Sequence, residues 1–333
     1  MPRPTLHAVI LAGGPGVRFW PWSTPRTPKH ALPLLPDGGT LFGATVRRLR
    51  LLVPPSRLWL VTTAAQAGTL RRLAPTLRPD RVIVEPEARD TAPAVGVAAK
   101  RILAADPDGM MLVCPADHAI SPDVLFARQA RAAARLAAGG RLVTFGIRPT
   151  RPATGYGYLE VGRGSRVEAF REKPSPGKAR AYLRSGRFLW NAGIFCWRAD
   201  VFLRALSEHA PELARRLDSE VPLKRLYPTL PRISVDYAVM EKAADVAFVR
   251  AAFRWSDWGT WTAWEETLKP DARGNRVFGN ARVERCRDTT AVGADPRRPL
   301  VVTGAEGHLV VQAPAGLLVC RRDQADDLKR LLA

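Results

Sequence analysis

Hydrophobic positions in the first 150 residues alternate between two patterns. Short apolar runs predict buried strands over residues 7–12, 58–62, 81–84, 110–114 and 141–146. Between these runs, apolar residues recur at three- and four-residue spacings, which predicts helices over residues 42–53, 65–73, 92–105 and 123–138. Strands that alternate with helices form an α/β fold, so we expect a mainly parallel, Rossmann-like sheet covered by helices on both faces.

The pattern changes after residue 155. Short strands at 156–161, 167–171 and 193–197 surround one helix at 176–184, which predicts an antiparallel excursion. Helical spacing returns at 199–217 and 236–243.

The last 60 residues carry a third pattern, in which short apolar runs alternate with turn residues. The runs lie at 282–286, 290–292, 300–303, 309–312 and 317–320. They predict a small all-β module, followed by a terminal helix over 323–332. The polar, Gly- and Asn-containing segment 271–275 marks a boundary, so we expect one domain over 1–270 and a second over 271–333.

Composition limits the class of protein. The chain has 333 residues, of which 46% are hydrophobic, and this is enough for a sizeable core. No segment has the length and hydrophobicity of a membrane span, and the first residues lack the apolar stretch of a signal peptide, so we expect a cytoplasmic protein. Its four cysteines, Cys114, Cys196, Cys286 and Cys320, are far apart, which argues against a zinc site or a disulfide framework.

The charge is strongly positive. The chain has 43 arginines and 8 lysines, and its net charge is +20. Such a balance suits nucleic acid, a membrane surface or a polyanionic small substrate. The arginines are spread along the chain, as on a solvated surface, but residues 1–60 hold eight cationic side chains and one acid, Asp37. The excess of positive charge makes this segment suited to binding phosphate groups.

The first strand ends in a glycine-rich loop. Leu11 and Ala12 lead into Gly13, Gly14 and Gly16. Glycines let the backbone approach phosphate oxygens and offer N–H groups to them. The loop fits neither a dinucleotide fingerprint nor a Walker loop. Arg18 and Lys29 follow, and fixed cations are what nucleotidyl transfer requires. A plain strand-to-helix turn is the alternative for the glycines.

Two aspartates are candidate metal ligands. Asp117 lies just beyond the carboxyl end of a predicted parallel strand, where ligands bind in such sheets, and Asp257 is the second candidate. Mg²⁺ prefers one or two carboxylates together with phosphate oxygens and water. The alternatives are a helix N-cap for Asp117 and a simple turn for Asp257.

Several segments together resemble the sugar nucleotidyltransferases, and within them the mannose-1-phosphate guanylyltransferase family. The signature is the loop 11–23 (LAGGPGVRFWPWS) with Pro28 and Lys29. Further matching segments follow in order: EP at 85–86, TAPA at 91–94, PADH at 115–118, FGIRPT at 145–150, TGYGY at 154–158, FREKP at 170–174, WNAGIF at 190–195, SVDYAVMEK at 234–242 and WSDWGTW at 255–261. The length corresponds to the short, single-activity form of that family. Asp90 and Trp258 depart from its pattern, which usually has Asn and a smaller apolar residue there.

The resemblance implies a reaction and a set of site residues. GMP is transferred from GTP to mannose 1-phosphate, with Mg²⁺ or Mn²⁺ held by Asp117 and Asp257. Glu85, Thr91 and Ala92 contact the base. The sugar phosphate is held by a larger set, namely Gly157, Glu172, Lys173, Asn191 and Asp257. An exposed ion pair is the alternative for Glu172 and Lys173.

The resemblance also implies an architecture and leaves alternatives open. The C-terminal module is expected to be a small left-handed β-helix-like coil, and modules of this kind commonly form homodimers. We expect neither nucleic acid nor membrane as a partner. The alternatives are a sugar nucleotidyltransferase of the dTDP- or UDP-glucose type, a non-catalytic sensor of sugar nucleotides, and a basic nucleic-acid-binding protein.

Overall fold

A computed structural model describes residues 4–14 and 16–328, without the side chains of residues 17, 326 and 327. Its contacts group these residues into two compact units. The first unit joins the start of the chain, up to Gly13, with residues 42–256. The second joins residues 14–41 with the chain from Asp257 onwards. The predicted domain boundary at residue 270 stays a prediction.

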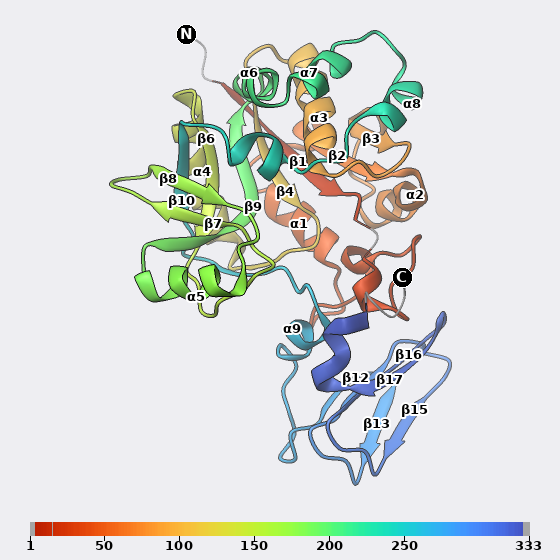
Figure 1. The fold of residues 1–333 in the computed structure, drawn as a ribbon. Coiled ribbons are helices and arrows are strands. Elements are labelled where there is room, and N and C mark those ends of the chain that lie inside the picture. The colour runs from red at the N-terminus through yellow and green to blue at the C-terminus, as the bar shows by residue number, and fades with distance from the viewer. Residues whose placement is uncertain (1–3, 15, 329–333) are drawn as a thin grey trace. The chain divides into compact units, whose positions relative to one another are not determined.

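A nine-stranded sheet is the centre of the first unit (Figure 1). Its strands are β1 (Thr5–Ala12), β2 (Leu58–Thr63), β3 (Val82–Glu85), β4 (Gly109–Pro115), β6 (Leu142–Ile147), β7 (Tyr158–Val161), β8 (Val167–Arg171), β9 (Phe188–Arg198) and β10 (Val246–Arg250). The order is β10-β6-β9-β4-β1-β2-β3, with β7 beside β9 and β8 beside β7. Strands β4, β1, β2 and β3 are parallel to one another, and β6 is parallel to β10. The prediction of a mainly parallel α/β sheet is confirmed.

The antiparallel excursion is also confirmed. Strand β9 runs antiparallel between β4 and β6, and it pairs with β7 of the β7–β8 hairpin. Its first residues therefore lie at the edge of the sheet where β4 ends. A separate two-stranded ribbon is formed by β5 (Ala119–Ser121) and β11 (Arg254–Ser256), which the hydrophobic pattern does not predict.

Helices pack on both faces of this sheet. They are α1 (Leu41–Leu49), α2 (Ala64–Leu73), α3 (Thr91–Ala105), α4 (Asp123–Ala138), α5 (Pro176–Ser185), α6 (Ala199–His209), α7 (Pro211–Leu217) and α8 (Leu223–Leu226). One core cluster joins α3, α6 and α7 with the sheet and includes Leu142 of β6. Phe145 lies three residues further along β6, so it faces the opposite side, where it stacks on Phe126 of α4.

Two predicted helices are corrected. The predicted helix over 199–217 is two helices, because Pro211 lacks the N–H that would continue α6 and instead begins α7. The predicted helix over 236–243 is a short π-helical turn at Asp236–Met240. The remaining helical turns of this unit are the 3-10 segments Pro55–Arg57, Pro79–Arg81 and Tyr227–Thr229.

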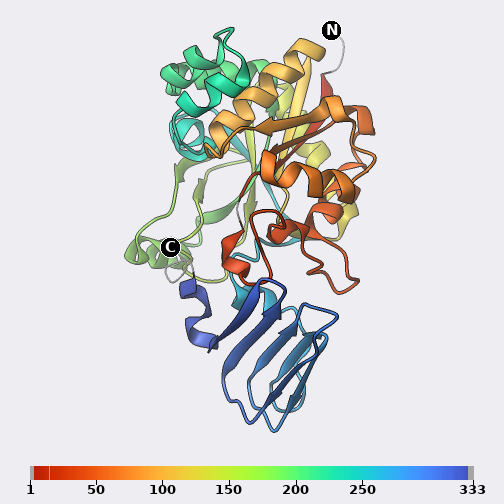
Figure 2. The same ribbon diagram turned by 90° about the vertical axis from the view of Figure 1, so that its right-hand side faces the viewer.

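The second unit combines the glycine-rich loop with the C-terminal strands, as the red and blue segments of Figure 2 show. Strands β12 (Arg276–Gly279), β14 (Thr290–Gly293), β16 (His308–Ala313) and β17 (Gly316–Arg321) form one sheet, and β13 (Ala281–Glu284) pairs with β15 (Leu300–Thr303). All of these pairs are parallel except β16 with β17.

Short helical turns complete the second unit. They are Val17–Phe19, Lys29–Ala31, α9 (Trp261–Glu265) and Arg322–Asp327. The last of these is a 3-10 helix at the position of the predicted terminal helix, and residues 329–333 lie outside the described part of the chain.

An aromatic cluster is the core of the second unit. Trp22 lies 5.5 Å from Phe278 and 6.1 Å from Trp264, measured between ring centroids. Phe19 lies 4.7 Å from Trp261. The tryptophans at 258, 261 and 264 are packing residues, since all three are buried. The cluster joins residues 14–41 to the C-terminal strands.

Candidate functional site

The ends of β1 and β3 form the first part of the site. Glu85 is the last residue of β3, and its side chain is buried beside Gly13. A Cβ atom at Gly13 would lie 2.8 Å from Glu85 Oε2, so any residue larger than glycine at this position would displace the carboxylate. Tyr227 donates a hydrogen bond from its hydroxyl to Glu85 Oε1. Burial raises the pKa of Glu85, and the hydrogen bond from Tyr227 opposes that rise.

The turn before α3 is held by its own hydrogen bonds. Asp90 caps the helix, since its carboxylate accepts a hydrogen bond of 2.7 Å from Thr91 N. Ala92 N donates to Ile233 O at 3.1 Å, and Thr91 Oγ1 accepts from Val235 N at 2.9 Å. The backbone N–H groups of Thr91 and Ala92 are thus both engaged within the protein.

Asp117 lies at the carboxyl edge of the sheet, directly after β4. It precedes β5 and is no helix N-cap, because α4 begins at Asp123 with Pro122 in the cap position. The carboxylate of Asp117 is partly exposed, and its Oδ1 lies 4.0 Å from His118 Nε2. His118 Nδ1 in turn accepts a hydrogen bond from Trp255 Nε1 at 3.2 Å.

The start of β9 brings Asn191 to this same edge of the sheet. Asn191 N donates to Gly157 O at 2.8 Å. The side chain of Asn191 is fixed on both sides: Oδ1 accepts from Thr144 Oγ1 at 2.7 Å, and Nδ2 donates to Asp236 Oδ1 at 2.9 Å. Asn191 therefore presents one orientation of its amide.

Glu172 and Lys173 follow β8 and form an ion pair of 2.9 Å. The side chain of Glu172 is 7% exposed and that of Lys173 is 55% exposed, so the pair is only half solvated. A Cβ atom at Gly157 would lie 2.5 Å from Glu172 Oε2, which places Gly157 against this carboxylate. Burial lowers the pKa of Lys173, but the hydrogen bond and the charge of Glu172 outweigh it and raise the pKa overall.

Asp236 is an acidic group beside Glu172 and Lys173. Burial and the negative charge of Glu172 raise its pKa to about 7, against the opposing effects of Lys173 and Asn191. The resemblance assigns no role to Asp236, although it lies within one of the matching segments. The only signal in the sequence was a single acid among the apolar residues of 234–240.

The second unit brings three further predicted residues together. Lys29 is buried, and its ammonium donates hydrogen bonds to the carbonyls of Asp257 and Trp258, the latter at 3.3 Å. Arg18 Nη1 donates to Gly259 O at 3.3 Å. A Cβ atom at Gly259 would lie 3.1 Å from Asp257 Oδ2 and 3.4 Å from Arg18 Nη1. The carboxylate of Asp257 and the guanidinium of Arg18 therefore both lie beside Gly259.

Strained backbone is concentrated in these segments. Five described residues other than glycine have a positive φ, and three of them are Asp90 (65°), Lys173 (43°) and Trp258 (39°). Such conformations cost energy and persist where the surrounding structure holds them, commonly at functional sites.

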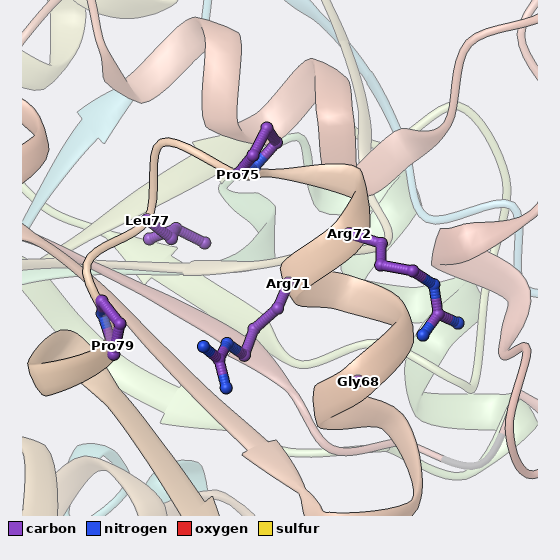
Figure 3. A pocket seen from close by; sticks show the side chains of 6 residues that line it. All are labelled: Gly68, Arg71, Arg72, Pro75, Leu77 and Pro79. Atoms are coloured by element: carbon purple, nitrogen blue, oxygen red, sulfur yellow. The ribbon is translucent and has the colours of Figure 1, made fainter.

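The predicted site residues therefore fall into two sets. Leu11–Gly13, Glu85, Thr91, Ala92, Asp117, Gly157, Glu172, Lys173 and Asn191 belong to the first unit, whereas Gly14, Gly16, Arg18, Lys29 and Asp257 belong to the second. A separate cavity of about 480 Å³ lies in the first unit near the end of α2, lined by Gly68, Arg71, Arg72, Pro75, Leu77 and Pro79 (Figure 3). It shares no residue with the candidate site, and the side chains of Arg71 and Arg72 point in different directions there.

Comparison with known proteins decides the family. A family model described as nucleotidyl transferase matches residues 7–273. The chain belongs to this family. Among the curated relatives of this nucleotidyltransferase is a mannose-1-phosphate guanylyltransferase from Sinorhizobium fredii, 37% identical over 99% of this chain and 67% of the relative. Xanthan biosynthesis protein XanB from Xanthomonas campestris is 34% identical over 98% of this chain and 72% of its own.

A solved structure is similar over nearly the whole length of both chains. It is titled as a mannose-1-phosphate geranyltransferase from Thermus thermophilus and is 35% identical, with a TM-score of 0.86. The match covers 98% of this nucleotidyltransferase and 99% of that chain. No helix in the described part of the nucleotidyltransferase has the length and hydrophobicity needed to cross a membrane.

Proposed function

We propose that this nucleotidyltransferase transfers GMP from GTP to mannose 1-phosphate, which yields GDP-mannose and pyrophosphate. The observation that carries the proposal is the match over nearly the whole chain with relatives named for this reaction. The local chemistry supports it, because the predicted site residues include cations, carboxylates and glycines whose neighbours leave no room for a side chain.

The reaction needs charge neutralisation more than acid–base chemistry. A phosphate oxygen of mannose 1-phosphate, already anionic at neutral pH, forms a bond to the α-phosphorus of GTP. The bond from that phosphorus to the bridging oxygen breaks, and pyrophosphate leaves with the electron pair. No proton moves, so no general base is required, and catalysis rests on positioning and on offsetting charge.

On the nucleotide side, the proposal assigns the loop Leu11–Gly16, with Arg18 and Lys29, to the phosphates. Glu85 offers a carboxylate acceptor to the N1–H and exocyclic amine of guanine, and the Thr91–Ala92 turn is assigned to the base as well. The bonds that engage Thr91 N and Ala92 N leave carbonyl and hydroxyl oxygens as the groups that this turn offers.

On the sugar side, the proposal assigns Glu172 and Asn191 to the hydroxyl groups and Lys173 to the phosphate. Lys173 suits this role because its side chain is more than half exposed and its raised pKa keeps it charged. The carbonyl of Gly157 already accepts from Asn191 N, so Gly157 contributes chiefly the space beside Glu172.

The chemistry of two predicted ligands suits a divalent cation. The carboxylates of Asp117 and Asp257 are hard oxygen donors, and Mg²⁺ characteristically takes one or two of these with phosphate oxygens and water. No group of three or more His, Cys, Asp or Glu side chains lies together in the described part of the chain, so a cage made of protein alone is not part of the proposal. When bound, Mg²⁺ or Mn²⁺ offsets the charge of the phosphates.

The architecture of the second unit extends the proposal. Two successive layers of parallel pairs, β12–β14–β16 and β13–β15, suit a small left-handed β-helix-like coil. We propose that this module joins two copies of the chain into a homodimer and that the enzyme works in the cytoplasm.

The test is pyrophosphate release from a panel of substrates. GTP, ATP, UTP and dTTP are each combined with mannose, glucose and glucosamine 1-phosphates, with and without Mg²⁺. We expect turnover with GTP and mannose 1-phosphate, and a requirement for the metal. Lys29→Ala, Lys173→Ala and Asp257→Asn should each lower the rate by about 10²–10³.

Three outcomes would count against the proposal. Turnover with another pair alone would reassign the substrates. Release with no pair would remove the enzymatic activity. Unchanged rates in the Lys29 and Asp257 variants would remove these residues from the site.

A further inference from the structure

One segment of the first unit contacts both the candidate base residues and the candidate sugar residues. It runs from Tyr227 to Asp236, here called the 227–236 segment. At its start, Tyr227 donates a hydrogen bond to Glu85. At its end, Asp236 accepts one from Asn191. These two partners lie 106 positions apart in the sequence and belong to different strands of the sheet.

The nucleotide side of this segment is tied by four hydrogen bonds. Besides the bond from Tyr227 to Glu85, Arg89 Nη2 donates to Pro228 O and Ala92 N donates to Ile233 O. Val235 N donates to Thr91 Oγ1. Every one of these bonds reaches the stretch Glu85–Ala92, so the two segments lie along each other from the end of β3 to the first turn of α3.

The sugar side is tied through Asp236. Its carboxylate accepts from Asn191 Nδ2, while Asn191 Oδ1 accepts from Thr144 Oγ1 and from Gly193 N. Removing Asp236 leaves the amide nitrogen of Asn191 without this acceptor, while Gly193 N and Thr144 Oγ1 still bind the amide oxygen. Asp236 therefore holds the nitrogen end of the Asn191 amide.

The segment between these two ends is stiff. Pro228 and Pro231 each fix one φ angle, and Leu230 and Val235 are each only 1% exposed, so they anchor the backbone in the core. Few backbone rotations remain free within the segment. A displacement at one end therefore moves the other end as well.

We propose that Tyr227 and Asp236 are positioning residues of the reaction, and that the 227–236 segment links the base site to the sugar site. The inference rests on the proposed function, because it takes Glu85 and Asn191 as substrate contacts. When GTP binds to Glu85, it fixes the position of the 227–236 segment. The segment in turn fixes Asn191 in the position that binds mannose 1-phosphate. Each substrate therefore binds better in the presence of the other.

The test compares KM values for both substrates in two variants. Tyr227→Phe keeps the ring and removes the hydroxyl, and Asp236→Leu keeps a similar volume and removes the acceptor of Asn191 Nδ2. We expect Tyr227→Phe to raise the KM for GTP about tenfold, the cost of one hydrogen bond to a charged group. It should also raise the KM for mannose 1-phosphate, measured at saturating GTP, about threefold. Asp236→Leu should show the reverse ranking.

Matched controls separate positioning from general damage. Tyr182→Phe removes a hydroxyl from a ring that stacks on Phe188 in another cluster, and Asp245→Asn breaks an exposed ion pair with Arg141. Neither residue has a role in the proposed site, so both variants should keep wild-type KM values. Thermal unfolding of all four variants checks that the fold is retained.

A second pair of variants acts on the segment without touching Glu85 or Asn191. Thr91→Val deletes the acceptor of Val235 N, whereas Thr91→Ser keeps it. Because Thr91 is itself a proposed base contact, the KM for mannose 1-phosphate is the informative value. We expect Thr91→Val to raise it and Thr91→Ser to leave it near wild type. A purely structural role predicts a lower melting temperature with unchanged KM values.

The failures of the two proposals are distinguishable. A wild-type enzyme that releases no pyrophosphate from GTP and mannose 1-phosphate ends the proposed function. In the other case, the wild-type enzyme turns over GTP and mannose 1-phosphate normally while each variant changes no KM, or only the KM of the substrate nearest to it. That result would refute the link between the two sites and leave the proposed function intact.

Discussion

At the scale of single residues, two glycines of the candidate site are defined by the carboxylates beside them. Gly13 leaves room for Glu85, and Gly157 leaves room for Glu172. Neither glycine has a left-handed backbone, so what each position requires is space and not unusual dihedral angles. A single added methyl group is therefore a selective probe of each carboxylate.

The sugar side can be tested in this way with Gly157→Ala. The new Cβ would lie 2.5 Å from Glu172 Oε2 and 3.2 Å from the ring of Phe170, so Glu172 must move. We expect the KM for mannose 1-phosphate to rise about tenfold, as for the loss of one hydrogen bond to a charged group, while the KM for GTP stays near wild type. Gly155→Ala, two residues away with no atom within 4 Å of the added methyl, is the matched control. Equal effects in the two variants would refute the space argument.

The base side can be tested by its pH dependence. Burial raises the pKa of Glu85 above its usual value of 4.5, and the hydrogen bond from Tyr227 opposes this rise. An ionised Glu85 is the form that accepts from guanine, so affinity for GTP should be lost as the pH falls through this raised pKa. Tyr227→Phe removes a group that stabilises the anion and raises the pKa further.

The measurement is the KM for GTP as a function of pH in wild type and Tyr227→Phe. The acidic limb of the variant should lie at higher pH than that of the wild type. Coinciding limbs, or a limb displaced to lower pH, would show that Glu85 is not the titrating group that binds GTP.

At the scale of elements, the start of α3 depends on Asp90. Its φ of 65° is unusual for a residue with a side chain, and its carboxylate accepts from Thr91 N. Asn and Asp tolerate such a backbone better than other residues and also cap helices. We expect Asp90→Ala to lower the free energy of unfolding by about 1–2 kcal/mol, whereas Asp90→Asn stays near wild type. Denaturant unfolding of both variants checks this, and equal loss in both would rule out capping as the cause.

Elements with strong local patterns could be predicted from the sequence, and elements defined by distant partners could not. The apolar runs that form β1, β2 and β4 are buried on both faces, so their hydrophobicity alone marks them. Strands β5 and β11 have three residues each and pair across more than 130 positions, so no local pattern signals them. The proline at 211 is a local signal for a helix boundary, and the prediction of one continuous helix there was wrong.

The candidate site also contains residues that a local motif reveals and residues whose roles depend on distant partners. Its glycines, cations and carboxylates lie in short motifs that could be found in the sequence. Tyr227 and Asp236 could not be assigned in this way, because their roles come from hydrogen bonds to Glu85 and Asn191, which are 142 and 45 positions away. Lys29 could be found from its motif, but its partners could not, because its contacts with the carbonyls after β11 span more than 220 positions.

At the scale of the whole molecule, the C-terminal strands share a unit with the glycine-rich loop. Trp22 of the loop segment packs on Phe278 of β12, and Gly316 at the start of β17 leaves room for Trp20, whose ring would lie 3.2 Å from an added Cβ. Lys29, from the same segment, is fixed on the carbonyls of Asp257 and Trp258. The strands therefore act as a scaffold for residues that the proposed reaction uses.

This scaffold role can be tested at Phe278, which is far from Lys29 in sequence and touches no proposed substrate contact. Phe278→Ala removes the ring that lies between Trp22 and Trp264, whereas Phe278→Leu keeps an apolar side chain of similar size. We expect the alanine variant to lower kcat/KM for GTP at least about tenfold, because one ångström of misplacement at a charged contact has a large effect on rate. The leucine variant should retain most of the activity.

Val277 provides a control on the opposite face of β12. It is the residue adjacent to Phe278 and is 42% exposed, so Val277→Ala should leave kcat/KM unchanged. If Phe278→Ala folds and matches the wild-type kcat/KM, the loop is held by its own turns and hydrogen bonds, and the C-terminal strands serve another purpose.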